Sequence, residues 1–66
     1  MEETFYYELK YPGKDTVGEY GFESYDDAYD AMTEAMTEMV DGIAEEHPEI
    51  PDEEIEKMID WEVRPE

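Results

Sequence analysis

Apolar and polar side chains alternate through residues 4–11, TFYYELKY. Phe5, Tyr7, Leu9 and Tyr11 would lie on one side of an extended chain, and the residues between them would lie on the other side. A period of two is typical of a strand that buries only one of its faces. This stretch is therefore expected to be a half-buried β-strand.

A tight turn and a return strand are predicted next. Pro12 and Gly13 suit the central positions of a type II turn, because proline presets φ and glycine accepts a positive φ. Residues 16–22, TVGEYGF, then form the second strand of a hairpin. The register that collects most large apolar side chains on one face pairs Tyr11 with Thr16, Leu9 with Gly18, Tyr7 with Tyr20 and Phe5 with Phe22. On the other face it pairs Tyr6 with Gly21, and Glu8 with Glu19 as an unfavourable like-charge pair.

The apolar spacing changes to that of an amphipathic helix after Ser24. Ser24 is a candidate N-cap, and Asp27 stands three residues later as a weak form of the capping box. Gly42 is a candidate C-terminal stop. The predicted buried stripe of this long helix consists of Tyr25, Ala28, Tyr29, Met32, Ala35, Met36, Met39, Val40 and Ile43.

A second, shorter helix is predicted over residues 52–60, because Pro51 suits its first turn. Ile55, Met58 and Ile59 are expected to face inward. Residues 61–65 alternate again, and they either extend this helix or pair with the hairpin as a third strand. The strand is favoured, since an isolated hairpin is only marginally stable. The expected fold is α+β: an antiparallel hairpin with a C-terminal third strand, packed on one long and one short helix, as a single domain over residues 1–66.

Charge adds a second layer to this interpretation. The chain has 66 residues, of which 22 are acidic and four are basic, and its net charge is −18. Direct binding to nucleic acid or to an anionic membrane is disfavoured, because both need lysine and arginine. No apolar run approaches the roughly 20 residues of a membrane span, and no leader is recognisable. A cytoplasmic protein is therefore expected.

Residue types that carry catalytic chemistry are scarce. There is no cysteine, and Ser24 and His47 are the only serine and histidine. Ser24 already has a use as a cap, and His47 lies between Glu46 and Pro48 in an expected solvated turn. No glycine-rich loop could hold phosphate, and the acidic run at residues 52–54 lacks the ligand spacing of a calcium loop. We expect no enzyme activity, no cofactor and no metal site.

The long helix is expected to carry an acidic row of Asp26, Asp30, Glu34 and Glu38, each four residues from the last. Like charges at this spacing cost roughly 0.2–0.5 kcal/mol per pair. Ordinary surfaces interleave lysine, and this helix has none. The row therefore indicates a functional requirement. The candidate partner-binding residues are Asp26, Asp27, Asp30, Glu34, Glu38, Asp41, Glu45, Glu46, Asp52, Glu53 and Glu56.

A row of carboxylates about 6 Å apart along a helix offers a basic groove a periodic anion, as DNA does. In size, charge and layout the whole chain resembles small acidic phage-borne inhibitors of host defence, which include anti-CRISPR proteins and anti-restriction DNA mimics. No sequence motif carries this resemblance, so no residue role is transferred. It implies a basic nucleic-acid-binding partner, either a Cas protein or a restriction enzyme, in the cytoplasm of a host bacterium. An inhibitor that blocks target DNA binding by a type I CRISPR surveillance complex is the favoured expectation.

Two other functions stay open at the level of sequence. The charge could be halophilic adaptation, in which case the chain should unfold at low salt, where its self-repulsion loses screening. Alternatively, the chain could be a small acidic adaptor or antitoxin-like module that binds a basic partner or a second copy of itself. A monomer is favoured over a dimer.

Overall fold

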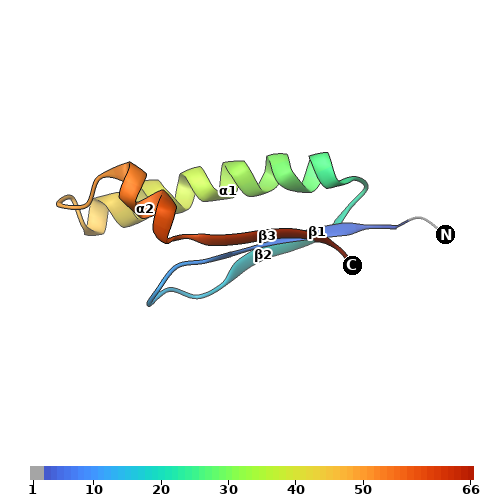
Figure 1. The fold of residues 1–66 in the computed structure, drawn as a ribbon, viewed down its shortest axis with the longest axis horizontal. Helices are drawn as coiled ribbons and strands as arrows, with labels where there is room; N and C mark the ends of the chain where they lie inside the picture. The colour runs from blue at the N-terminus through green and yellow to red at the C-terminus, as the bar shows by residue number, and fades with distance from the viewer. Residues whose placement is uncertain (1–2) are drawn as a thin grey trace.

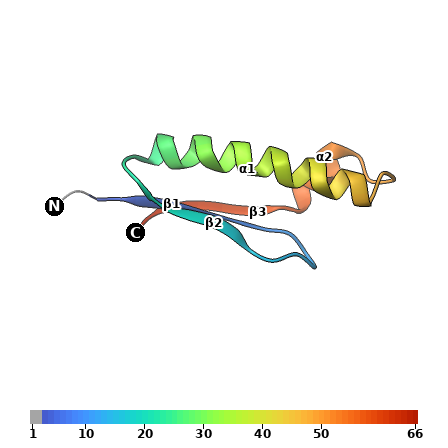
Figure 2. The ribbon, with the colours of Figure 1, turned by 180° about the vertical axis from the view of Figure 1, so that it is seen from behind.

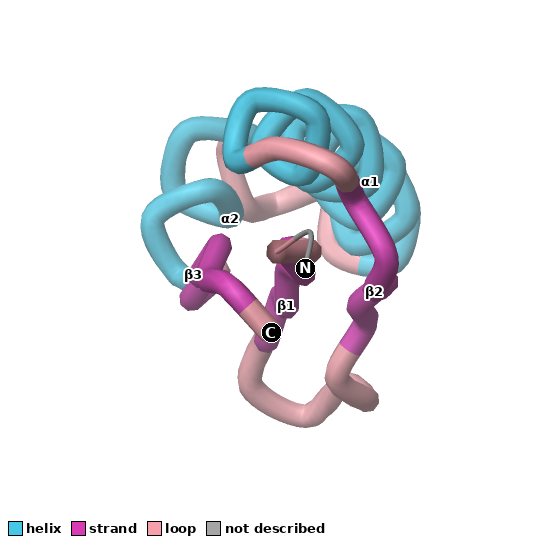
Figure 3. Tube along the Cα trace, turned by 90° about the vertical axis from the view of Figure 1, so that its right-hand side faces the viewer, coloured by secondary structure: helices cyan, strands magenta, loops and turns pink. Residues whose placement is uncertain are grey.

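The computed structural model describes residues 3–66 as two layers (Figures 1 and 3). One layer is a sheet of three antiparallel strands, β1 (Phe5–Lys10), β2 (Val17–Phe22) and β3 (Asp60–Pro65). The other layer contains α1 (Tyr25–Glu46) and α2 (Asp52–Met58). This arrangement confirms the predicted α+β class, the two helices and the third strand. Residues 1–2 of the expected single domain lie outside the described residues.

β1 is the central strand of the sheet, whose order is β2-β1-β3. The pairing with β3 is regular and runs from Lys10 opposite Asp60 to Phe5 opposite Pro65. Both helices cover the same face of the sheet, as Figures 1 and 2 show from opposite sides. The inward side chains of β1 therefore meet the helices, and within residues 3–66 no element covers the outward face.

The hairpin turn has the predicted form. The Lys14 amide donates a hydrogen bond of 3.0 Å to the Tyr11 carbonyl oxygen. This bond closes a four-residue turn with Pro12 and Gly13 at its centre. Gly13 has φ +83°, which the second central position of a type II turn requires.

The predicted hairpin register is wrong over most of its length. Phe5 opposes Phe22 as expected, but Tyr7 opposes Glu19 and Leu9 opposes Val17, because β2 contains a bulge between these pairs. Gly21 lies in the bulge with φ +88°, a conformation that glycine adopts without strain.

The bulge turns Tyr20 to the outer face, where it stacks on Tyr6 with ring centroids 5.3 Å apart. It also places Gly18 opposite Glu8 and so avoids the expected pair of Glu8 with Glu19. Gly18 fits there because a Cβ would lie 2.5 Å from the Tyr7 carbonyl oxygen.

α1 begins where predicted and ends later than predicted. The Ser24 hydroxyl oxygen accepts a hydrogen bond of 3.1 Å from the Asp27 amide, so Ser24 is confirmed as the N-cap. The predicted stop at Gly42 is wrong, since the helix continues to Glu46. It ends at His47 because Pro48 follows, and a proline disfavours helical geometry in the residue before it.

α2 begins at Asp52 as predicted, with Pro51 as its N-cap, but it ends at Met58 and not at residue 60. Ile55 and Ile59 are buried as expected. The prediction for Met58 is wrong, because its side chain is 43% exposed. The early end of α2 allows β3 to start at Asp60 and pair with Lys10.

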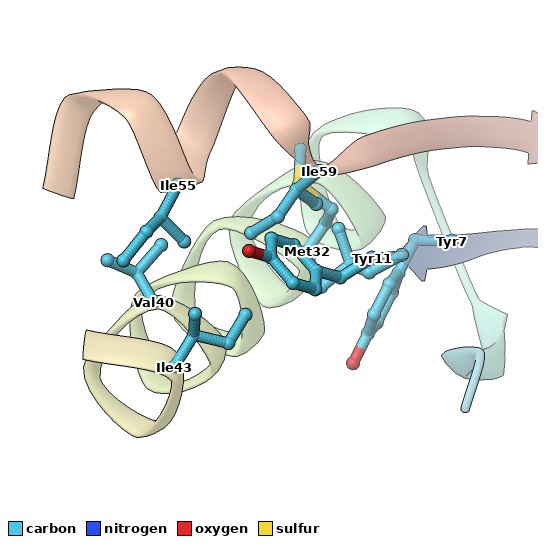
Figure 4. Close-up of a cluster of buried hydrophobic side chains, with 8 residues drawn as sticks. Tyr7, Tyr11, Met32, Val40, Ile43, Ile55 and Ile59 are labelled. Carbon is cyan, nitrogen blue, oxygen red and sulfur yellow. The ribbon is translucent and has the colours of Figure 1, made fainter. Parts of the chain in front are cut away.

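The core lies between the layers and is closed at one end by α2. Figure 4 shows Ile55 and Ile59 near Val40 and Met32 of α1 and near Tyr11, which directly follows β1. Leu9 and Ile55 are fully buried. Two members of the predicted buried stripe are instead exposed, since Tyr25 and Tyr29 show 46% and 41% of their surface.

The molecule is elongated, with extents of 48 × 19 × 15 Å and a radius of gyration of 12.9 Å. A compact chain of this length would have a radius of about 11 Å. The length comes from α1 lying along the sheet, with α2 and the hairpin turn together at the end away from the termini (Figure 1).

Candidate functional site

The outward side of α1 is an acidic face. Eight of the 22 helix residues are acidic and none is basic. All eight are exposed, and so are the three candidate residues of α2. The structure thus leaves every candidate partner-binding residue open to solvent: Asp26, Asp27, Asp30, Glu34, Glu38, Asp41, Glu45, Glu46, Asp52, Glu53 and Glu56.

Helical geometry decides how these carboxylates line up. Positions four apart advance by about 40° around a helix with 3.6 residues per turn. The predicted row from Asp26 to Glu38 therefore winds around α1 toward the β2 side. Positions seven apart drift by only about 20°, so Asp27, Glu34 and Asp41 form the straighter line along the outward side. Glu45, five full turns after Asp27, continues this line, and Asp30 and Glu38 flank it on either side.

The basic residues lie away from this face. Lys10 and Arg64 belong to the sheet, Lys14 lies in the hairpin turn, and Lys57 is in the last turn of α2. The Arg64 guanidinium pairs with Glu62 at 3.0 Å. Charge is therefore segregated: the helical layer holds 12 acidic residues and Lys57, whereas the outward sheet face mixes both signs.

One candidate carboxylate already has a partner within the chain. The Lys14 ammonium donates to both oxygens of Glu46, at 2.7 and 2.9 Å. This hydrogen bond, followed by the charge of Lys14, holds the pKa of Glu46 below its usual range. The pair joins the hairpin turn to the C-terminal end of α1, so Glu46 is less available to an external cation than its neighbours are.

An apolar groove lies between α1 and the start of β2, and the sequence analysis did not predict it. Its volume is about 460 Å³, within the range of about 300–1,000 Å³ typical of ligand pockets. Val17, Ala35, Met39 and Ile43 supply apolar lining, and Gly42 lies among them. Asp15, Glu38 and Glu46 add carboxylates. The sequence signal for this groove is Gly42, a glycine inside a helical pattern, and a glycine in that place equally predicts a helix stop.

A smaller depression adjoins Tyr7 and is lined by Glu19 of β2 and by Glu34 and Glu38 of α1. The Tyr7 side chain is 3% exposed, and Figure 4 shows its hydroxyl pointing away from the labelled core cluster. Burial, followed by the negative charges of Glu19 and Glu38, raises the pKa of the Tyr7 hydroxyl above its usual value of 10.0. Glu34 and Glu38 are thus members of the acidic row that lie next to the sheet.

Across residues 3–66, no group of three histidine or acidic side chains converges as a metal site would. His47 is exposed in the connector and lies 3.4 Å from the Glu49 carboxylate. No helix in the described part of the chain has the length and apolar character to cross a membrane.

Known families and proteins offer no guide to this surface. No protein family matches the chain, and neither a curated protein nor a solved structure is detectably similar to it. Its function is therefore inferred from its own residues and their geometry.

Proposed function

We propose that this chain is a non-enzymatic inhibitor that imitates the charge of nucleic acid and occupies the basic DNA-binding groove of another protein. The observation that carries the proposal is the unbroken negative charge of α1, which has eight exposed carboxylates and no lysine or arginine. Such a face attracts a basic groove at long range and speeds the encounter. Inhibition then follows from exclusion of DNA.

The dimensions of α1 agree with this role. A helix of 22 residues is about 33 Å long, which is about one turn of B-DNA. Its eight acidic residues give one charge per about 4 Å of axis, and a single DNA strand carries one per about 3.4 Å. A groove along the outward side of α1 would meet the members of this set that lie there, among them Asp27, Glu34 and Asp41.

The proposed target is a CRISPR surveillance complex of type I, and a restriction enzyme is the second choice. This part of the proposal rests on the resemblance in size, charge and layout to phage-borne inhibitors. The physical requirement is broader, because any partner must present lysine and arginine along a groove of about 33 Å.

The test is competition with DNA. The protein is immobilised and loaded with a purified type I surveillance complex, and duplex target DNA is then added. The expected result is release of the complex by DNA and loss of target binding when the inhibitor is in excess. The variant Asp30→Lys/Glu34→Lys should fold normally and bind at least about tenfold more weakly, because two attractive charges become repulsive.

A matched control is Glu8→Lys/Glu62→Lys, which makes the same change in net charge on the opposite face, where these two residues oppose each other across β1 and β3. Binding that drops equally in both variants would show that only net charge matters. Capture that DNA cannot displace would contradict mimicry and favour the adaptor function. Unfolding of the parent protein at low salt, monitored by circular dichroism, would favour halophilic adaptation.

A further inference from the structure

The groove beside α1 has an apolar interior and an acidic rim. Met39 and Ile43 of α1 face Val17 of β2 across it. Val17 is 41% exposed, although it lies on the helix-facing side of its strand, opposite Leu9. The hairpin diverges from α1 toward this end of the molecule (Figures 1 and 2). Apolar surface is thus left uncovered between two elements that enclose the core elsewhere.

Gly42 keeps this groove open. It lies inside α1, four residues before the helix ends, and a Cβ built on it meets no atom within 4 Å. Glycine is among the least favourable residues in a helix interior, and nothing in the fold excludes alanine here. Any side chain at this position would project into the groove that Gly42 lines.

The charged residues around the groove favour a positively charged ligand. Asp15 and Glu38 line the groove together with the Lys14–Glu46 pair. Because Lys14 is bound to Glu46 at 2.7 Å, it offers little to an incoming anion. A second copy of this chain would bring further negative charge to the rim, since each copy carries −18. A cationic segment suits both the rim and the neighbouring acidic face.

We propose that the groove seats one large apolar side chain of the partner, on a segment that carries arginine or lysine on both sides. This inference rests on the proposed function, because the same basic partner would bind the acidic face of α1. The face would supply attraction and orientation, and the groove would supply a buried anchor. A few side chains buried in pockets carry most of the binding energy of protein interfaces, and a DNA-like charge pattern alone lacks such an anchor.

The first experiment uses the variants Gly42→Ala and Gly42→Met. Both should raise Tm, since both replace a helix-interior glycine in open space. Gly42→Met should weaken capture of the purified surveillance complex by roughly tenfold or more, the factor expected when burial of one large apolar side chain is lost. Tyr20→Met is the control, because Tyr20 is exposed on the outer sheet face, away from α1, and does not line the groove. It should bind as the parent does.

A second measurement needs no complex. The probe is a blocked pentapeptide with leucine between two pairs of arginines, and the comparison peptide has serine in place of leucine. The leucine peptide should bind more tightly and shift the methyl NMR signals of Met39, Ile43 and Val17. Gly42→Met should remove this preference. Equal binding of the two peptides, or an unchanged preference in Gly42→Met, would overturn the proposed anchor site.

The two proposals fail in different ways. Capture that survives Gly42→Met and is lost in Asp30→Lys/Glu34→Lys overturns the groove and leaves the acidic inhibitor in place. Selective binding of the leucine peptide, combined with no displacement of any captured complex by DNA, keeps the groove as a binding site and overturns DNA mimicry.

Discussion

The two ends of the Tyr7 side chain lie in different environments: its ring belongs to the core, and its hydroxyl lies beside acidic surface residues. Its ring packs against Phe22 with centroids 5.8 Å apart, and its hydroxyl lies between two elements that each contribute a carboxylate, Glu19 and Glu38. Burial of the side chain, followed by the negative charges of Glu19 and Glu38, opposes ionisation of this hydroxyl and raises its pKa. The folded protein therefore holds Tyr7 in its neutral form more strongly than the unfolded chain does.

This difference predicts a pH effect. The pKa of Tyr7 is raised above 10.0 in the folded state, so its contribution to stability is complete below that pH. The contribution is lost as the pH rises through the folded pKa. Tyr7→Phe has no proton to lose and should retain more of its stability in strong alkali, as measured by urea unfolding at stepped pH. Tyr20→Phe is the control, because Tyr20 is 65% exposed. Identical alkaline profiles for the parent and Tyr7→Phe would contradict this account.

At the scale of elements, a chain of aromatic contacts ties α1 to β3. Tyr25 meets Phe5 and Tyr29, with ring centroids 6.4 and 6.2 Å apart. Tyr29 in turn meets Trp61 edge to face at 5.7 Å. These rings are partly exposed at the side of the two layers. The aromatic seam, made of Phe5, Tyr25, Tyr29 and Trp61, covers this edge of the core.

Trp61 is the only tryptophan, which makes this seam observable. Tyr29→Ala should shift Trp61 fluorescence emission to longer wavelength, because the indole gains contact with water. It should also lower the free energy of unfolding by about 1–2 kcal/mol, from lost aromatic contact and burial. Tyr20→Ala removes a tyrosine from the opposite face and should leave the emission unchanged. An unshifted spectrum in Tyr29→Ala would show that the edge-to-face contact is absent in solution.

The spacing of apolar residues predicted the strands and helices correctly, but it did not predict the register of β2 or the ends of the helices. The strand of Phe5, Tyr7 and Leu9 and the α1 stripe around Met32 were predictable, because burial of one face imposes a regular spacing. The register of β2 was not predictable, since a bulge at Gly21 costs little and lets Tyr20 stack outward. The two tyrosines of α1 matched the helical spacing, yet they pack against Phe5 and Trp61 with one side of each ring left exposed.

The candidate surface was predictable in part for a similar reason. Charge identifies the outward side of an amphipathic helix, so the exposed carboxylates of α1 could be named in advance. The groove depends on how far the hairpin diverges from α1, which is a property of tertiary packing. Gly42 was its one local sign, and a glycine near the end of a helical pattern is more often a terminator.

At the scale of the whole molecule, the carboxylates of α1 repel one another, and no lysine or arginine within α1 offsets this repulsion. Glu34 has an acidic residue four positions away on each side, Asp30 and Glu38. Glu34→Lys turns both repulsive pairs into attractive ones. It should raise the free energy of unfolding by roughly 1 kcal/mol at low ionic strength.

The dependence on salt separates this effect from packing. In about 1 M salt, charges are screened beyond roughly 3 Å, and the advantage of Glu34→Lys should shrink. Glu34→Gln removes the repulsion without adding attraction, so chemical denaturation in urea should place it between the parent and Glu34→Lys. A ranking that is unaffected by salt would mean that the carboxylates of α1 do not interact appreciably.

The position of β1 has a consequence for how the chain is completed during synthesis. This central strand pairs with β3, whose residues lie 50 to 60 positions later in the sequence. The hairpin and α1 can form locally while the ribosome is still elongating the chain, but one edge of β1 stays unpaired until β3 emerges. Contacts of such long range slow folding, and an unpaired strand edge invites association with other chains. The complete sheet therefore forms only after β3 has left the ribosome. The acidic face of α1 and the groove take their native positions relative to each other at that stage.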